Sequence, residues 1–152
     1  MSILSKVNAL LARAGRILQC LVLLVIRLYW GWQFFADGKG KLTHLDRVTA
    51  YFASLNIPAP RLNCILASTT ECVCGMLLLL GLLSRFASLA LIGVMSTAYL
   101  TAEREALNSF FSDPDKFTGA TPFLFLYASV LIFAFGPGKI ALDTLVFKDK
   151  AA

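Results

Sequence analysis

Charged residues are scarce in this chain. Of its 152 residues, 15% are charged and 58% are hydrophobic, whereas a soluble domain carries about 25% charged residues. The mean hydropathy is correspondingly high, at +0.73. These values argue against a soluble domain and predict a membrane protein. The length fits a single membrane domain over residues 1–152.

The motifs that hold metals and redox cofactors are also missing. The chain has one histidine, and its four cysteines, Cys20, Cys64, Cys72 and Cys74, form no CxxC pair. It has no haem-attachment motif and no glycine-rich dinucleotide fingerprint. We therefore expect no metal site, and we interpret the cysteines as small buried apolar residues. A redox role would need a cofactor or a partner protein from outside the chain.

Basic residues outnumber acidic ones, which gives a net charge of +5 and a pI of about 9.2. In a soluble protein this excess would favour binding to nucleic acid. In a membrane protein the positive-inside rule accounts for it, because cytoplasmic segments are enriched in Lys and Arg. We therefore expect a lipid bilayer, and no nucleic acid, as the partner of this surface.

Apolar stretches predict four transmembrane helices, at residues 15–36, 62–83, 86–102 and 121–136. The glycines and charges of ADGKGKLTHLD are expected to end the first helix. Leu45, Val48, Phe52 and Leu55 then recur at helical spacing, which predicts a short helix over residues 44–55 on the membrane surface. The predicted fold class is all-α: an integral membrane four-helix bundle with this interfacial helix in its first outer loop.

The distribution of charge predicts the side on which each loop lies. The N-terminal segment, the turn at residues 84–85 and the C-terminal segment carry an excess of basic residues. In the loops at residues 37–61 and 103–120, basic and acidic residues balance. The positive-inside rule then places the N- and C-termini in the cytoplasm and the two long loops outside.

Two charged residues fall inside the predicted spans. Arg27 lies in CLVLLVIRLYWGWQFF, and Glu71 lies in LNCILASTTECVCGMLLLLGLL. Counted from the outer span ends near Ala36 and Leu62, both lie about 13 Å deep at 1.5 Å per residue. This depth is close to the middle of a hydrocarbon core about 30 Å thick. An unpaired charge there costs about 3 kcal/mol, so an Arg27–Glu71 ion pair between antiparallel helices is predicted.

Other residues join this pair in a candidate pocket for quinone or another substrate. Gly31 and Gly75 share helix faces with Arg27 and Glu71, and small residues allow membrane helices to approach closely. The polar side chains expected around the pocket are Tyr29, Gln33, Ser68, Tyr99 and Tyr127. The structural alternatives are a pair that only fixes helix register and, for the aromatic residues of the first span, an interfacial belt.

Four segments in order, GWQFFADGKGKL, YFASLNIPAP, ECVCGMLLLLGLLSRFASLAL and FGPGKIALDTL, resemble the DoxX family of small four-helix membrane proteins over roughly residues 23–146. Family sequences often have an arginine in the first span and a glutamate before two glycines in the second. Arg27 and Glu71 stand at these positions, with Cys74 in place of the first glycine and Gly75 as the second. The resemblance implies a protein of the bacterial inner (cytoplasmic) membrane with a role in redox chemistry.

Three functions remain open. The first is a membrane subunit of a redox complex with quinone as its cofactor, as the resemblance implies, since relatives include membrane subunits of a thiosulfate:quinone oxidoreductase. Arg27 would then polarise a quinone carbonyl and Glu71 would exchange its proton; if the chain is enzymatic, it is a quinone-linked oxidoreductase subunit. The second is a non-catalytic accessory or scaffold subunit with other subunits of a membrane complex as partners. The third is a small transporter, which the lack of an inverted repeat disfavours.

Overall fold

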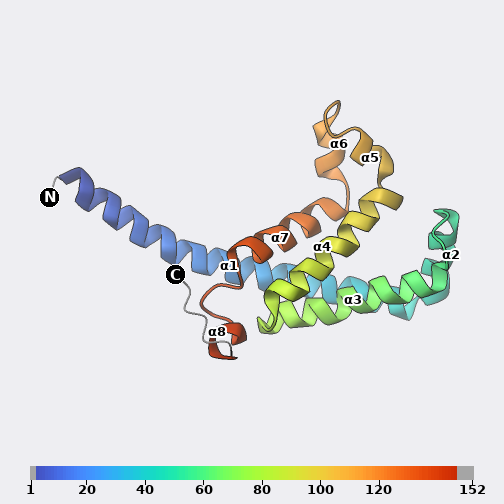
Figure 1. Cartoon of the computed structure of the whole chain (residues 1–152), viewed down its shortest axis with the longest axis horizontal. Coiled ribbons are helices and arrows are strands. Elements are labelled where there is room, and N and C mark those ends of the chain that lie inside the picture. The colour runs from blue at the N-terminus through green and yellow to red at the C-terminus, as the bar shows by residue number, and fades with distance from the viewer. Residues whose placement is uncertain (1–2, 147–152) are drawn as a thin grey trace.

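The structure, a computed structural model, describes residues 3–146, and within that range it is all helical and contains no strand (Figure 1). The helices are α1 (Ile3–Thr43), α2 (Leu45–Ser54), α3 (Pro60–Leu80), α4 (Ser84–Thr101), α5 (Arg104–Asn108), α6 (Pro114–Gly119), α7 (Pro122–Phe135) and α8 (Leu142–Val146). The all-α prediction is therefore confirmed over the described residues.

The first helix is much longer than the predicted span of residues 15–36. It has 41 residues and a length of about 60 Å at 1.5 Å per residue. It does not end at the glycines of ADGKGKL, because Gly38 lies against α3, where a Cβ atom would come within 2.6 Å of the Ser68 carbonyl oxygen and the Cys72 nitrogen. Gly38 therefore permits close packing inside a continuous helix and does not terminate it.

The remaining long helices lie near their expected positions. α3, α4 and α7 begin and end within a few residues of the stretches at 62–83, 86–102 and 121–136. Proline at the first position of α3 and of α7 favours helix initiation, and Gly81 ends α3 in the left-handed conformation, with φ of 69°.

Two antiparallel helix pairs form the body of the molecule. α1 packs most extensively on α3, and α4 packs on α7, while α3 and α4 join the two pairs. The buried core lies between them and consists of Phe34, Cys74, Leu78, Ala87, Leu91, Met95 and Ile132. The pairs pack against one another through apolar faces. Many further apolar side chains lie on the outer surface.

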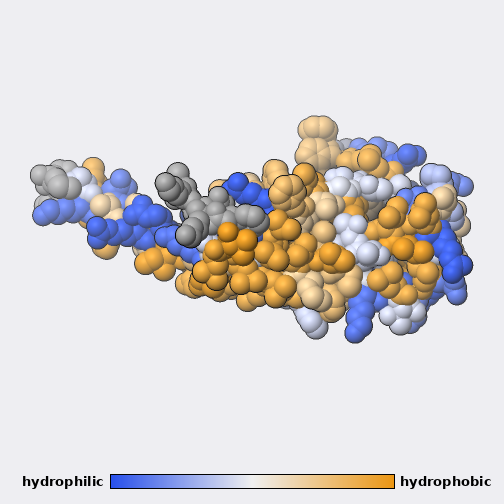
Figure 2. Space-filling view, turned by 60° about the horizontal axis from the view of Figure 1, so that its bottom comes forward, coloured by the Kyte–Doolittle hydropathy of each residue, from blue (hydrophilic) through white to orange (hydrophobic). Residues whose placement is uncertain are grey.

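The helices define two ends of the molecule (Figure 1). We call the end that carries α2, α5 and α6 the α2 end, and the end that carries α8 and the α3–α4 turn the α8 end. In Figure 2 hydrophobic side chains cover much of the middle, whereas hydrophilic side chains gather at the α2 end and along the projecting N-terminal part of α1. This pattern is expected of a lipid-facing apolar belt between two ends that contact water.

By length and composition, α1 and α3 can each cross a membrane. α7 is strongly apolar but has 14 residues, about 21 Å of helix at 1.5 Å per residue, against a core about 30 Å thick. α4 has 18 residues, so its length is closer to that needed for a crossing.

Candidate functional site

The most deeply buried acid of the described chain forms an ion pair with the last turn of α1. Glu71, on α3, has 1% of its surface exposed. The ammonium nitrogen of Lys41 donates to both carboxylate oxygens of Glu71, each at 2.6 Å. The side chain of Lys41 is 34% exposed, so the pair has a buried carboxylate on one side and an accessible cation on the other.

A glycine contact explains how this pair forms. Gly38 lies one turn before Lys41, and its missing side chain lets α1 approach the backbone of α3 beside Glu71. Further along the same interface, a Cβ atom on Gly75 would meet the Phe35 nitrogen at 2.6 Å, and one on Gly31 would meet the Gly75 carbonyl oxygen at 3.1 Å. Gly31 and Gly75, expected at a close helix contact, thus lie in one.

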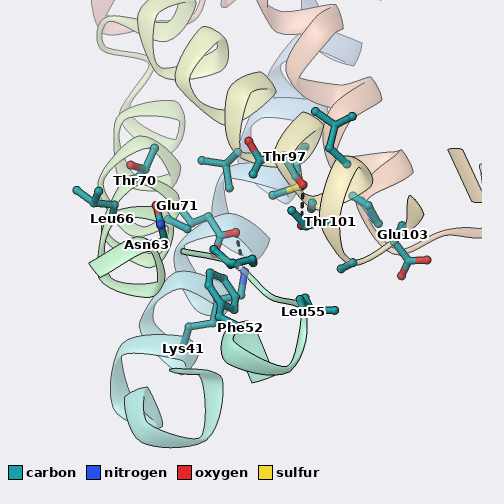
Figure 3. Close-up of a pocket in the computed structure, with 18 of the residues that line it drawn as sticks. Lys41, Phe52, Leu55, Asn63, Leu66, Thr70, Glu71, Thr97, Thr101 and Glu103 are labelled. Atoms are coloured by element: carbon teal, nitrogen blue, oxygen red, sulfur yellow. Dashed lines mark hydrogen bonds and ion pairs between the residues drawn. The ribbon is translucent and has the colours of Figure 1, made fainter. Parts of the chain in front are cut away.

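The ion pair lies in the wall of a cleft of about 1150 Å³ at the α2 end. Phe52 and Leu55 of α2, Leu66 of α3, and Val94 of α4 contribute apolar walls, together with Phe125 of α7. Figure 3 shows Lys41 and Glu71 meeting close to Phe52, with α3 on one side and α4 on the other. A mostly apolar cleft with a few placed polar groups is the usual form of a small-molecule site.

Two hydroxyl groups of α4 also line the cleft. The Thr97 hydroxyl donates to the Gly93 carbonyl at 2.9 Å, and the Thr101 hydroxyl donates to the Thr97 carbonyl at 2.7 Å. Since each hydroxyl donates its hydrogen bond to a carbonyl of its own helix, each oxygen can still accept a hydrogen bond from a ligand. The charged residues that line the cleft are Asp37, Lys41, Glu71, Glu103 and Arg104.

The predicted Arg27–Glu71 ion pair is wrong. Arg27 lies at the α8 end, where its two terminal nitrogens donate to the carbonyl oxygens of Pro137 at 3.0 Å and Ile140 at 2.7 Å. Gly81 lies against this guanidinium, since a Cβ atom there would come within 2.6 Å of Nη1. Backbone carbonyls, and not a carboxylate on α3, accept the hydrogen bonds of the buried arginine.

The error came from the helix register. With Ala36 and Leu62 as the ends of the two spans, Arg27 is expected level with Glu71. In the structure α1 continues to Thr43, so the two helices are displaced along one another and Gly38 lies level with Glu71. The helix face that contains Arg27, Gly31, Phe34 and Gly38 reaches Lys41 when it is extended by one turn. This extension of the face was the signal that could have identified Lys41.

The other predicted pocket residues are dispersed. Tyr29 and Tyr127 are exposed on the apolar surface, and Gln33 is half-buried on α1. Tyr99 is buried and donates to the Phe117 carbonyl at 2.9 Å, which ties α4 to α6. Ser68 is buried in α3, and its hydroxyl has no partner among the described residues. Of the predicted set, Glu71 lines the cleft.

A second polar cluster organises the α8 end. The Asp143 carboxylate accepts hydrogen bonds from the backbone nitrogens of Leu83 at 2.6 Å and Ser84 at 2.9 Å. The nitrogen of Asp143 in turn donates to the Gly81 carbonyl at 2.8 Å. Together with Arg27, these contacts fasten residues 136–143 to the α3–α4 turn.

Among the described residues, no group of three or more His, Cys, Asp or Glu side chains could hold a metal ion. The four cysteines are free, and Cys64 and Cys74 are buried in α3.

Helices long and apolar enough to cross a bilayer, with largely apolar surfaces, define a membrane protein. The chain belongs to the DoxX family, whose model matches residues 22–104, a range that contains Lys41, Glu71 and the α4 side of the cleft. The resemblance noted in the sequence is thereby confirmed.

Two relatives match most of this chain over most of their own length. It is 31% identical over 134 residues to an uncharacterized membrane protein of Mycobacterium tuberculosis, with 84% of this chain and 82% of the relative covered. It is 27% identical over 135 residues to an uncharacterized protein of Haemophilus influenzae, with 83% of each covered. No solved structure matches the chain significantly.

Proposed function

We propose that this DoxX-family protein is a membrane subunit of a redox complex and binds a quinone-class molecule in the cleft at the α2 end. The observation that carries the proposal is the Lys41–Glu71 pair, whose buried carboxylate and accessible ammonium lie in the wall of an apolar cleft. Placing ionisable side chains in an apolar layer costs free energy, and such residues in membrane proteins usually mark a functional site.

The proposal includes a placement in the bilayer. α1, α3, α4 and α7 cross the inner membrane as a four-helix bundle, and the amphipathic α2 lies in the outer interface. The α2 end then faces outward and the α8 end faces the cytoplasm, which agrees with the basic residues of the N-terminal part of α1 and with Arg85 and Lys139. The cleft would be reached from the outer half of the membrane.

The residues of the cleft fit a quinone head group. The Lys41 ammonium has three N–H groups, and two of them bond Glu71, which leaves one for a ligand carbonyl. Thr97 and Thr101 offer acceptor oxygens for a ligand hydroxyl, and Phe52, Leu55 and the other apolar walls suit a ring and its tail. When bound, a quinone supplies two-electron, two-proton chemistry to a complex.

The chain's own contribution is to bind, orient and protonate. Glu71 holds the Lys41 nitrogen at one position, because both carboxylate oxygens accept from it. Lys41 Nζ is the group that would donate to the ligand, and the buried Glu71 carboxylate would take up or return a proton. Electrons would come from a partner subunit, for which the chain supplies the membrane-embedded site.

The charges of the cleft also bear on the class of ligand. Three acids, Asp37, Glu71 and Glu103, line it with two bases, Lys41 and Arg104. This balance suits a neutral ligand better than an anion such as thiosulfate, which would meet unpaired carboxylates. An anionic electron donor would therefore react on the partner subunit.

An accessory role without catalysis is the second candidate. The segment between α5 and α6 presents Phe111 with 93% of its surface exposed, next to the half-exposed Phe110. A large aromatic side chain on the wet α2 end is typical of a contact with another protein. In this case the segment would dock a partner whether or not the cleft holds a ligand.

Co-purification tests the proposal. The protein is purified from its native membranes, and bound quinone is extracted and quantified for the wild type and for the double variant Lys41→Met, Glu71→Gln. The double variant removes both charges at once and leaves no lone buried ion, so it is expected to fold. Its quinone content should fall about tenfold or more, since a hydrogen bond to a charged group contributes about 1.5–3 kcal/mol.

A matched control comes from the exposed pair Lys116–Glu105, at 3.1 Å. The variant Lys116→Met, Glu105→Gln should keep the wild-type quinone content. A wild-type protein that carries no quinone and binds none when it is added would contradict the proposal. Equal quinone content in the Lys41, Glu71 double variant and the wild type would contradict it as well.

A further inference from the structure

The first part of α1 is exposed to solvent along its length. Every residue from 4 to 19 is exposed, and Figure 1 shows this stretch projecting beyond the other helices at the α8 end. We call residues 4–19 the arm. Since α1 is about 60 Å long at 1.5 Å per residue and the hydrocarbon core is about 30 Å thick, the arm lies outside the core in the proposed placement.

The arm is amphipathic. Leu4, Val7, Leu11 and Leu18 recur at spacings that place them on one helix face. They are exposed by 79%, 48%, 64% and 62%. An uncovered apolar stripe of this length would be unfavourable in water.

The opposite side of the arm is basic. Lys6, Arg13 and Arg16 lie away from the apolar stripe, on a side that also carries the exposed Leu10 and Ile17. The chain has no Asp or Glu before Asp37. Arg85 and Lys139 lie at the same end of the molecule and are exposed. The arm therefore carries positive charge that no acidic residue of the first 36 positions offsets.

We propose that the arm docks on a membrane surface rich in anionic phospholipid. Its apolar stripe lies at the boundary between headgroups and acyl chains, and Lys6, Arg13 and Arg16 interact with headgroup phosphates and water. Charge complementarity selects this occupant over a second copy of the chain, because two arms side by side would bring like charges together with no carboxylate between them. The inference uses the proposed bilayer placement and is independent of any ligand in the cleft.

Docking requires α1 to bend where the arm meets the bilayer. Gly15 is exposed, and a Cβ atom there would meet nothing within 4 Å. Glycine is the least stable of the ordinary residues inside a helix, by about 1 kcal/mol relative to alanine. A bend near Gly15 therefore costs less than one elsewhere in the arm.

Fluorescence of the full-length protein in lipid nanodiscs tests the proposal. An environment-sensitive fluorescent amino acid replaces Leu11 on the apolar stripe or, as a matched control, Ala9 on the opposite face. The discs contain phosphatidylcholine alone or phosphatidylcholine with phosphatidylglycerol. The emission at position 11 should shift to the blue in the anionic discs and return toward the water value in phosphatidylcholine, while position 9 stays water-like in both.

Charge removal and salt provide the second part of the test. Replacing Lys6, Arg13 and Arg16 by Gln should weaken docking about fivefold per charge removed, since each basic side chain near an anionic surface contributes about 1 kcal/mol. Raising the salt concentration on the unsubstituted arm should weaken docking in the same direction without any risk to folding. A blue shift of equal size in both lipids, with two copies per disc, would show that a second copy covers the stripe. A water-like probe at position 11 in the anionic discs would also overturn the proposal.

Discussion

Lys41 and Glu71 meet with both carboxylate oxygens 2.6 Å from a single ammonium nitrogen, although 30 residues separate them in the chain. The contact joins the last turn of α1 to the middle of α3, and the backbone approach at Gly38 makes it possible. The cleft at the α2 end, the close packing of the two helices and the buried charge are therefore parts of one arrangement, and changing one should disturb the others.

Breaking the ion pair from one side should be costlier than removing it. Lys41→Met leaves the Glu71 carboxylate buried without its cation, and Glu71→Gln leaves the lysine without its anion. Lys41→Met should lose about 3 kcal/mol of stability, and the double variant should recover most of that loss. Glu71→Gln should lose less, because the Lys41 side chain is 34% exposed and its ammonium can reach water. Unfolding by increasing SDS fractions in mixed micelles measures both effects. Additive losses in the double variant would mean that the two side chains do not interact.

The α1–α3 contact should be sensitive to a single methyl group. Gly38→Ala introduces a Cβ atom 2.6 Å from two backbone atoms of α3, which should cost about 1–3 kcal/mol and separate Lys41 from Glu71. Gly40→Ala is the matched control, because nothing lies within 4 Å of its Cβ position, and it should leave stability unchanged or raise it by up to about 1 kcal/mol. The same SDS titration compares them; equal effects would refute the close contact.

Arg27 should hold the C-terminal segment without affecting the cleft. Arg27→Ala removes the hydrogen bonds to the Pro137 and Ile140 carbonyls, each about 1.5–3 kcal/mol for a charged donor. Trypsin should then cleave after the exposed Lys139 at least about tenfold faster, while quinone content stays at the wild-type level. Arg47→Ala, on the exposed surface of α2, should leave the cleavage rate unchanged. Loss of quinone in the Arg27 variant would instead link the two ends of the bundle.

The proposed orientation predicts the behaviour of topology reporters. A fluorescent protein fused after residue 152 should fold and fluoresce in the cytoplasm, whereas alkaline phosphatase inserted after Ile57, between α2 and α3, should be active outside the inner membrane. The two reporters give independent readings of the two ends. Inactive phosphatase together with a dark C-terminal fusion would show the opposite orientation, with the cleft on the cytoplasmic side.

The local features of this protein could be predicted from its sequence, because hydrophobicity and helical spacing determine them. The all-helical class, the positions of α3, α4 and α7, and the glycine contact between α1 and α3 follow from such patterns. Glu71 stood out because a carboxylate in an apolar stretch needs a partner. These inferences depend on composition and on the spacing of residues along each helix.

The partner of Glu71 could not be predicted, because it depends on how far two helices slide along one another. Glycine favours helix ends in general, so ADGKGKL predicts a helix terminus and places Lys41 in a loop. In the structure Gly38 packs against α3 instead, and α1 continues through Lys41. The partners of Arg27 are equally hard to predict, because its acceptors are backbone carbonyls of a segment more than 100 residues away.

Photo-crosslinking with an azido-quinone, followed by mass spectrometry of the full-length protein in its native membranes, tests the central claim most directly. Labels are expected on cleft residues from at least two helices, such as Phe52 or Leu55 of α2 and Thr97 or Thr101 of α4. Excess unlabelled quinone should compete with the labelling, and the Lys41→Met, Glu71→Gln variant should abolish it. Labels confined to the α8 end around Arg27, or spread over the lipid-facing surface without competition, would contradict it.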